Sequence, residues 1–253
     1  GEVECVLCPP FTSLSVVAEL VKGTGLRVGA QNMHWEDQGA FTGEVSPLMV
    51  KELCQYVIIG HSERRQYFGE TDESVNRKVK AALKHGLIPI VCVGENLTQN
   101  EAGLTDSVVS GQVRAALADL AAAQVSGLVI AYEPVWAIGT GLTASAAQAQ
   151  DMHAHIRSML RTHGDVVAAT VPILYGGSCK PDNAAAIFSC PDVNGGLIGG
   201  AALVGSLGLG LLVKGRLAEL AGRVMLQLAK APEAFADGRM FLSYQWRNLL
   251  IFG

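Results

Sequence analysis

Seven short runs of apolar residues recur along the chain, and longer amphipathic stretches separate them. The runs hold Val, Ile and Leu at consecutive positions, so both faces of each predicted strand are apolar, as in a parallel sheet covered by helices. Strand and helix alternate at a spacing of roughly 25 to 40 residues, which indicates right-handed βα units. The predicted strands span residues 3–7, 26–31, 56–60, 89–93, 128–131, 172–175 and 196–198.

Two of the separating stretches carry clear helix signals. Thr71 is a good N-cap, an acidic pair follows it, and Gly86 marks the end of the helix. Residues 145–162 form the second predicted helix, and Met152 and Ile156 lie on its apolar face. These helices would cover the outer side of the sheet.

The number of strands leaves two architectures open. A (β/α)₈ barrel needs eight strands, whereas an open doubly wound sheet tolerates seven. No Pro- or Ser-rich linker divides the 253 residues, so we expect a single domain, with 204–253 as an atypical C-terminal segment. That segment must supply an eighth strand or leave a gap. It offers a helix-like run at 207–221 and apolar stretches at 224–228 and 240–246.

Composition excludes several classes of function. The net charge is −4 and no basic block occurs, so we expect no nucleic-acid partner. Cys5-x-x-Cys8 lacks the second ligand pair of a zinc site, and we expect no metal and six reduced thiols in a cytoplasmic protein. Residues 195–213 are uncharged and 19 residues long, but seven of them are glycines. We therefore predict a strand, a turn and a helix start there and no membrane span.

The strongest candidate for chemistry is the stretch that begins at Tyr132-Glu133-Pro134. Glu133 follows a buried-strand pattern directly, and Pro134 keeps it out of the helical region. The loop continues with Trp136 and reaches Gly139-Thr140-Gly141. A carboxylate base joined to a mobile lid suits proton abstraction with exclusion of water. The alternative is a strand-ending Glu in an ordinary βα turn.

Other predicted strands also end in polar or glycine-rich residues. His61 follows one strand, Gly94-Glu95 another, Gly176-Gly177-Ser178 a third and Gly199-Gly200 the last. In a barrel these ends meet on one face, where such folds hold their active sites. His61 would polarise a carbonyl beside Glu133, unless it is a structural histidine, and the glycine turns would bind a phosphate through backbone N–H groups. Gly139 to Ala144 matches the G-x-G-x-x-A pattern of a dinucleotide-binding loop. It does not follow a strand directly and has no acidic residue at the required place, so no cofactor is expected.

These motifs, in this order and spacing, resemble the triosephosphate isomerase family. The resemblance covers about residues 1–203, and the lid motif is its most specific part. The matching segments are CPPFTSL (8–14), GAQNMHWEDQGAFTGEVS (29–46), GHSERR (60–65), VCVGE (91–95), AYEPVWAIGTG (131–141), ILYGGS (173–178) and GGLIGGAAL (195–203).

The resemblance implies a (β/α)₈ barrel of glycolysis and gluconeogenesis that interconverts dihydroxyacetone phosphate and glyceraldehyde 3-phosphate through an enediolate. Glu133 would move the proton between carbons, and His61 would act on the oxygens. Glu63 would support the site, and Cys92 would be a structural residue near it. Residues 31–46, from Gln31 to Ser46 with Thr42 near the tip, would form a homodimer. The residues expected to bind phosphate are Gly139, Ser178, Gly199 and Gly200.

The first strand of the family, which ends in an Asn-x-Lys motif and supplies the substrate cation, has no counterpart here. Gln245-Trp246-Arg247 resembles that motif weakly. One hypothesis is that 240–247 fills the first-strand slot, as in a circular permutation, and that Arg247, or alternatively Lys230, replaces the lysine. The other hypothesis is an unrelated extension and an impaired barrel that only binds small phosphate esters or serves as a scaffold. Arg is not a neutral substitute for Lys.

Overall fold

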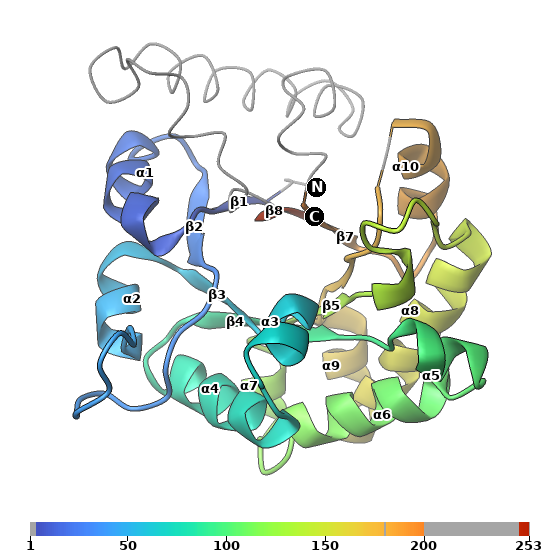
Figure 1. Ribbon diagram of the computed structural model, residues 1–253, viewed down its shortest axis with the longest axis horizontal. Helices are drawn as coiled ribbons and strands as arrows, with labels where there is room; N and C mark the ends of the chain where they lie inside the picture. The colour runs from blue at the N-terminus through green and yellow to red at the C-terminus, as the bar shows by residue number, and fades with distance from the viewer. Residues whose placement is uncertain (1–3, 180, 200–247, 253) are drawn as a thin grey trace.

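The computed structural model describes residues 4–179, 181–199 and 248–252. Eight strands close into a barrel in the order β1 to β8, and helices surround it (Figure 1). The strands are β1 (Glu4–Cys8), β2 (Arg27–Ala30), β3 (Tyr56–Ile59), β4 (Ile88–Val93), β5 (Val129–Tyr132), β6 (Ile173–Tyr175), β7 (Gly195–Ile198) and β8 (Asn248–Phe252).

Helices follow the strands and cover the outside of the barrel. They are α1 (Leu14–Leu20), α2 (Pro47–Leu53), α3 (Ser62–Tyr67), α4 (Asp72–Lys84), α5 (Leu97–Glu101), α6 (Thr105–Ala116), α7 (Ala122–Val125), α8 (Ala146–Leu160), α9 (Asp165–Thr170) and α10 (Pro181–Phe188). Single 3₁₀ turns lie at η1 (Phe11–Ser13), η2 (Val135–Ala137) and η3 (Arg161–His163). Each of the seven predicted strands is confirmed to within two residues at either end.

The two predicted helices begin where their caps indicated. The backbone N–H of Ser74 donates to Thr71 Oγ1 at 3.2 Å, and the backbone N–H of Thr71 donates to Ser74 Oγ at 2.9 Å. Ser145 and Gln148 form the same reciprocal arrangement at the start of α8. Such capping boxes satisfy backbone donors that have no partner within the helix.

The apolar strands serve two cores, which is why both of their faces are apolar. One face packs inside the barrel, and the other packs against the helices. Cys8 belongs to the inner cluster and Cys5 to the outer one, as expected for residues three apart on a strand. The inner cluster comprises Val6, Cys8, Tyr56, Ile58, Ile90, Cys92, Val129, Ala131, Leu174 and Leu197.

Strands β1 to β7 are parallel, whereas β8 runs antiparallel to both of its neighbours. Asn248 pairs with Cys8 and Phe252 with Glu4, so β8 begins at the end where the other strands finish. The C-terminal segment therefore closes the barrel, as one hypothesis required. The idea of a permuted first strand at 240–247 is wrong, because 248–252 occupies the slot and a permuted copy would run parallel. Residues 240–247 lie outside the described residues.

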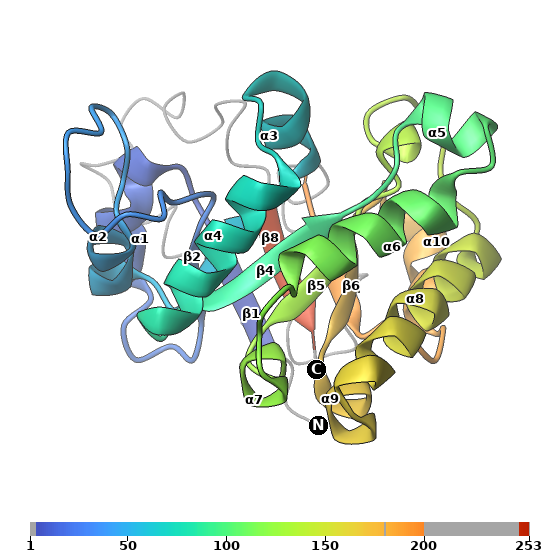
Figure 2. The same cartoon turned by 90° about the horizontal axis from the view of Figure 1, so that it is seen from below.

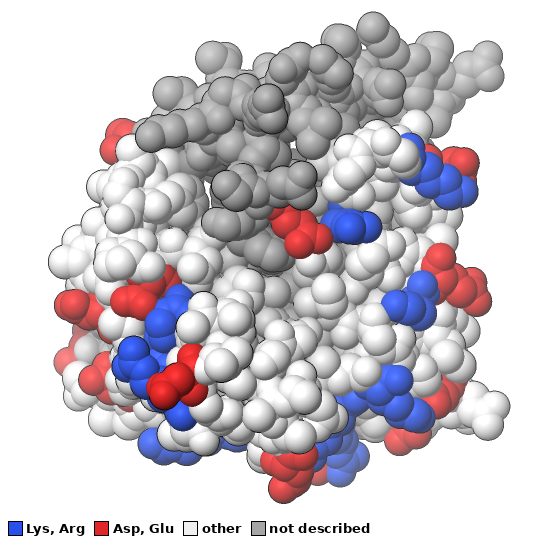
Figure 3. Space-filling view, turned by 180° about the vertical axis from the view of Figure 1, so that it is seen from behind, with Lys and Arg blue, Asp and Glu red and all other residues white. Residues whose placement is uncertain are grey.

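The two ends of the barrel differ in what covers them. Figure 2 shows α3 and α5 at one end and α7 and α9 at the other. The first end is where β1 to β7 finish, because α3 and α5 follow β3 and β4 directly. Lys and Arg side chains are interspersed with Asp and Glu on the face shown in Figure 3. None of the described helices has both the length and the apolar character needed to cross a membrane.

Candidate active site

Glu133 and His61 meet at the carboxyl end of the barrel strands. Glu133 directly follows β5, His61 lies between β3 and α3, and His61 Nε2 is 3.0 Å from Glu133 Oε1. Ser62 holds the same carboxylate: its backbone N–H donates to Oε2 at 2.9 Å and its Oγ to Oε1 at 3.1 Å. Glu133 is only 2% exposed, so these contacts replace water around the carboxylate. The predicted base and the predicted polariser therefore lie together.

Local geometry decides which nitrogen of His61 carries the proton. Nδ1 accepts a hydrogen bond from the backbone N–H of Glu63 at 3.3 Å, at the start of α3. A ring nitrogen that accepts has no proton, so the neutral ring carries its proton on Nε2. The Nε2–H group then points at the Glu133 carboxylate, and it would point at any acceptor that takes the place of this carboxylate. A neutral imidazole that donates through Nε2 is the form that polarises a carbonyl.

Two glycines allow the backbone around Glu133 to pack tightly. A Cβ on Gly94 would lie 1.8 Å from the carbonyl oxygen of Glu133, and one on Gly176 would lie 2.9 Å from its Cγ. Any larger residue would displace the base. The Glu133 N–H also donates to the carbonyl of Val93 at 2.8 Å, and the Gly176 N–H donates to that of Tyr132 at 2.7 Å. Adjacent strands thus fix the base from both sides.

Glu95 connects the site to the lid. Its side chain is fully buried and accepts from Trp136 Nε1 at 2.7 Å and from the Tyr132 hydroxyl at 3.2 Å. Asn100 Nδ2 donates to the same carboxylate at 3.3 Å. The sequence marked Glu95 as a strand-end residue but gave no partner for it, because the partners lie on another strand and in the lid.

The lid itself spans the turn η2 and the glycines that follow. Gly139 and Gly141 have φ of 71° and 85°, a region that favours glycine. Ser178 Oγ donates to the carbonyl of Ala137 at 2.5 Å, so the predicted phosphate turn after β6 contacts the lid. A cavity of about 820 Å³ lies beside the lid, and Glu63, Glu133 and Gly139 are among its lining residues.

The remaining predicted site residues fall into two groups. Cys92 lies inside the barrel, and burial, followed by the charge of Glu133, raises the pKa of its thiol well above the ordinary value. The thiol therefore stays neutral, and its structural role remains a prediction. Gly199 directly follows β7. Gly200, Lys230 and Arg247 lie outside the described residues, and in the part that the structure describes no cluster of His, Cys, Asp or Glu could hold a metal.

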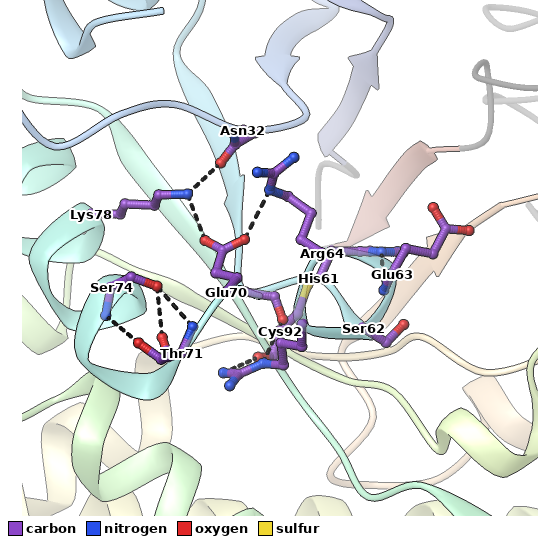
Figure 4. A network of polar contacts seen from close by, with 12 residues as sticks. Asn32, His61, Ser62, Glu63, Arg64, Glu70, Thr71, Ser74, Lys78 and Cys92 are labelled. Carbon is purple, nitrogen blue, oxygen red and sulfur yellow. Dashed lines mark hydrogen bonds and ion pairs between the residues drawn. The ribbon is translucent and has the colours of Figure 1, made fainter. Parts of the chain in front are cut away.

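A buried polar network stands behind His61. Glu70 Oε2 accepts from Arg64 Nε at 2.9 Å and Glu70 Oε1 from Lys78 Nζ at 2.7 Å, while Lys78 also donates to Asn32 Oδ1 at 2.8 Å (Figure 4). Burial lowers the pKa of Lys78, and Glu70 counteracts this effect. The network joins α3, α4 and the loop after β2.

Comparison with known proteins identifies the family. A model of the family "TIM: Triosephosphate isomerase" matches residues 1–209. The triosephosphate isomerase of Chloroflexus aurantiacus is 58% identical over 202 residues, which are 79% of this chain and 81% of that protein.

Two further relatives carry the same name. The Herpetosiphon aurantiacus protein is 57% identical over 202 residues (79% of this chain, 81% of its own), and the Clostridium tetani protein is 55% identical over 205 residues (80% of each). With the barrel, the Glu133–His61 pair and the lid, this match shows that the chain belongs to the triosephosphate isomerase family.

Proposed function

We propose that the chain interconverts dihydroxyacetone phosphate and glyceraldehyde 3-phosphate. The observation that carries this proposal is the 3.0 Å contact between His61 Nε2 and Glu133 Oε1 at the mouth of the barrel. The family match supports the same reaction, since the named relatives are triosephosphate isomerases. The enzyme is thus an aldose–ketose isomerase that needs no cofactor.

Proton transfer follows from the two side chains. The Glu133 carboxylate removes a proton from the carbon beside the substrate carbonyl, while His61 Nε2–H donates to the carbonyl oxygen. Charge develops on that oxygen in the enediolate, and His61 gives it the Nε2 proton and takes up the hydroxyl proton of the first carbon. Glu133 then returns its proton to the former carbonyl carbon, so that the carbonyl lies on the first carbon and both side chains regain their starting protonation. Without substrate, Glu133 is bound to Ser62 and His61. Substrate must therefore break the Glu133–His61 contact, because both groups have to reach it.

Phosphate binding falls to backbone N–H groups at the turns around the mouth. Gly139 in the lid, Ser178 and the pair Gly199-Gly200 are the proposed donors, and the Ser178–Ala137 contact supports a shared movement of lid and turn. Lid closure would exclude water from an intermediate that otherwise eliminates phosphate. Arg247 is the proposed cation, with Lys230 as its rival. Glu63 supports the site from the first turn of α3.

The assembly and the setting belong to the same proposal. We treat residues 1–253 as one barrel domain, because β8 at 248–252 pairs with β1 near the other end of the chain. A homodimer through residues 31–46 is supported by exposed apolar side chains in and near that loop, among them Phe41 and Met49. A cytoplasmic setting is supported by the free thiols of all six cysteines.

One observation favours a second function. The slot that supplies the lysine in the family holds β8, whose sequence Asn-Leu-Leu-Ile-Phe contains no cation. The chain would then bind small phosphate esters without efficient turnover, since loss of one transition-state electrostatic contact costs roughly 10²–10³ in rate.

Turnover of glyceraldehyde 3-phosphate by the purified chain, in a coupled assay, separates the two functions. We expect turnover that phosphoglycolate inhibits competitively. Binding of phosphoglycolate by calorimetry together with no turnover above that of buffer would establish the second function instead.

A further inference from the structure

Arg65 makes three contacts immediately behind the catalytic pair. Its Nε donates to the carbonyl of Gly60 at 2.8 Å, one terminal nitrogen donates to Asp72 Oδ1 at 2.6 Å, and the other donates to the carbonyl of Cys92 at 3.4 Å. Gly60 directly follows β3 and Cys92 lies on β4, so one guanidinium bridges two adjacent barrel strands near their ends. The side chain is 18% exposed, and Arg65 is the only Lys or Arg among the described residues that line the cavity beside Glu133.

The contact with Gly60 controls the backbone that carries His61. Gly60 has φ of 75°, and a Cβ there would lie 3.1 Å from the Arg65 guanidinium and 3.2 Å from the Cys92 carbonyl. The carbonyl of His61 accepts from the backbone N–H groups of Arg64 and Arg65 at 2.8 and 3.1 Å. The peptide groups on both sides of His61 are therefore fixed, one by the first turn of α3 and the other by the Arg65 side chain.

The geometry requires a guanidinium. Arg has five N–H donors in a rigid plane, whereas the single ammonium of Lys cannot reach three acceptors that lie just after β3, on β4 and on α4. The charge of Arg65 also reaches the site, because it opposes the effect of burial and of Glu133 on the pKa of the Cys92 thiol.

We propose that Arg65 is a positioning residue for the isomerase reaction: by holding the carbonyl of Gly60 it sets the direction in which His61 Nε2 faces Glu133. The inference rests on the proposed function for its kinetic part only. Arg65 touches no reacting atom in this arrangement and acts entirely through His61. Nothing in the local sequence distinguishes it from Arg64, whose side chain binds Glu70 instead.

The kinetic test compares Arg65→Met, Arg65→Lys and the matched control Asp72→Asn. Misplacement of a catalytic group by about 1 Å costs about 10²-fold, so we expect kcat to fall roughly 30- to 100-fold in Arg65→Met with KM within about threefold. We expect kcat of Arg65→Lys to be only slightly higher than that of Arg65→Met, because Lys keeps the positive charge but lacks the planar set of guanidinium N–H donors. Asp72→Asn leaves the Gly60 contact in place and should keep kcat within about twofold of the parent.

Two more measurements separate positioning from stability. Guanidinium ion at non-denaturing millimolar concentration should raise kcat of Arg65→Ala at least fivefold, whereas it should not affect Asp72→Asn. The NMR signal of the His61 Nε2–H proton should be present in the parent and in Asp72→Asn and absent in Arg65→Met.

The proton signal does not need turnover, so it tests the positioning role even if the parent proves inactive. An unchanged His61 signal in a folded Arg65→Met variant would overturn the inference, and so would an unchanged kcat. Loss of activity in all three variants in proportion to their thermal stability would overturn it as well.

Discussion

At the scale of single residues, the site is a set of side chains that lie one or two residues beyond the ends of strands. Their position near strand ends could be predicted from the sequence, because short apolar runs stop just before His61, Glu95 and Glu133. Their hydrogen-bond partners were not, because Ser62 and Trp136 reach these carboxylates only once the strands lie side by side. The pattern of apolar residues predicts on which strand or turn a residue lies, whereas its hydrogen-bond partners depend on the tertiary structure.

Trp136 should contribute measurably to stability through Glu95. Trp136→Phe removes the 2.7 Å hydrogen bond to a buried carboxylate, and such bonds to charged groups contribute about 1.5–3 kcal/mol. We expect the free energy of unfolding in urea to fall by about 2 kcal/mol. Trp35→Phe, in the loop after β2, is the control and should change it by much less. Equal effects of the two substitutions would show that the Glu95 contact is not special.

His153 should make the fold sensitive to acid. It lies between the rings of Tyr132 and Tyr175 and is fully buried, and burial lowers its pKa from 6.5 to about 4. Nδ1 lies 2.6 Å from the carbonyl of Ala149, and the charges of Arg157 and Asp192 act on the ring in opposite directions. Below pH 6.5 His153 binds a proton in the unfolded chain, whereas in the folded chain it stays neutral down to about pH 4. The free energy of unfolding therefore falls as the pH falls from 6.5 to about 4.

The test is the difference in unfolding free energy between the parent and His153→Phe at pH 7 and at pH 4. We expect the parent to lose about 3 kcal/mol relative to the variant over this range, since each unit of pKa shift corresponds to about 1.4 kcal/mol. A difference that does not depend on pH would mean that His153 already titrates normally in the folded protein.

At the scale of elements, the seven parallel strands were predictable and the eighth was not. Strands buried on both faces are recognisable because apolar residues fill consecutive positions. Residues 248–252 are equally apolar, but five residues carry no signal for direction, and antiparallel pairing satisfies the edges of β1 and β7 as well as parallel pairing would. The C-terminal segment therefore closes the barrel with β8 at 248–252. The weak motif resemblance at Gln245-Trp246-Arg247 had pointed to 240–247 instead.

Removal of β8 should open the barrel. Deleting residues 248–253 leaves the edges of β1 and β7 unpaired and opens the inner core to water. We expect the free energy of unfolding to drop by at least about 3 kcal/mol, the scale of a large core deletion, and dye binding to exposed apolar surface to rise. A chain that lacks only Gly253 is the control. Unchanged unfolding of the shorter chain would show that β8 adds nothing to the closed barrel.

At the scale of the whole molecule, exposed apolar side chains gather in one part of the chain. Of the eleven large hydrophobic residues exposed in the described part, five lie between residues 41 and 68. They are Phe41, Leu48, Met49, Tyr67 and Phe68. Phe41 lies within the loop 31–46, and Leu48 and Met49 follow it closely in the chain, which supports the proposed dimer through that loop.

Sedimentation tests the dimer. The parent should sediment as a dimer, and Phe41→Asp should sediment as a monomer, because a charge in an apolar interface has no partner there. Val166→Asp is the control: Val166 is 73% exposed on α9, at the end of the barrel away from the lid, and the variant should remain dimeric. A monomeric parent, or a dimeric Phe41→Asp, would contradict the proposed interface.

The central claim is that Glu133 carries the proton between two carbons of a triose phosphate. The most direct test is kcat of Glu133→Gln on glyceraldehyde 3-phosphate, with the near-ultraviolet circular dichroism spectrum as the check that the fold is kept. Loss of a general base typically costs 10²–10⁴-fold, and we predict a fall of at least about 10³-fold with an unchanged spectrum. A folded Glu133→Gln variant with the kcat of the parent would contradict the account.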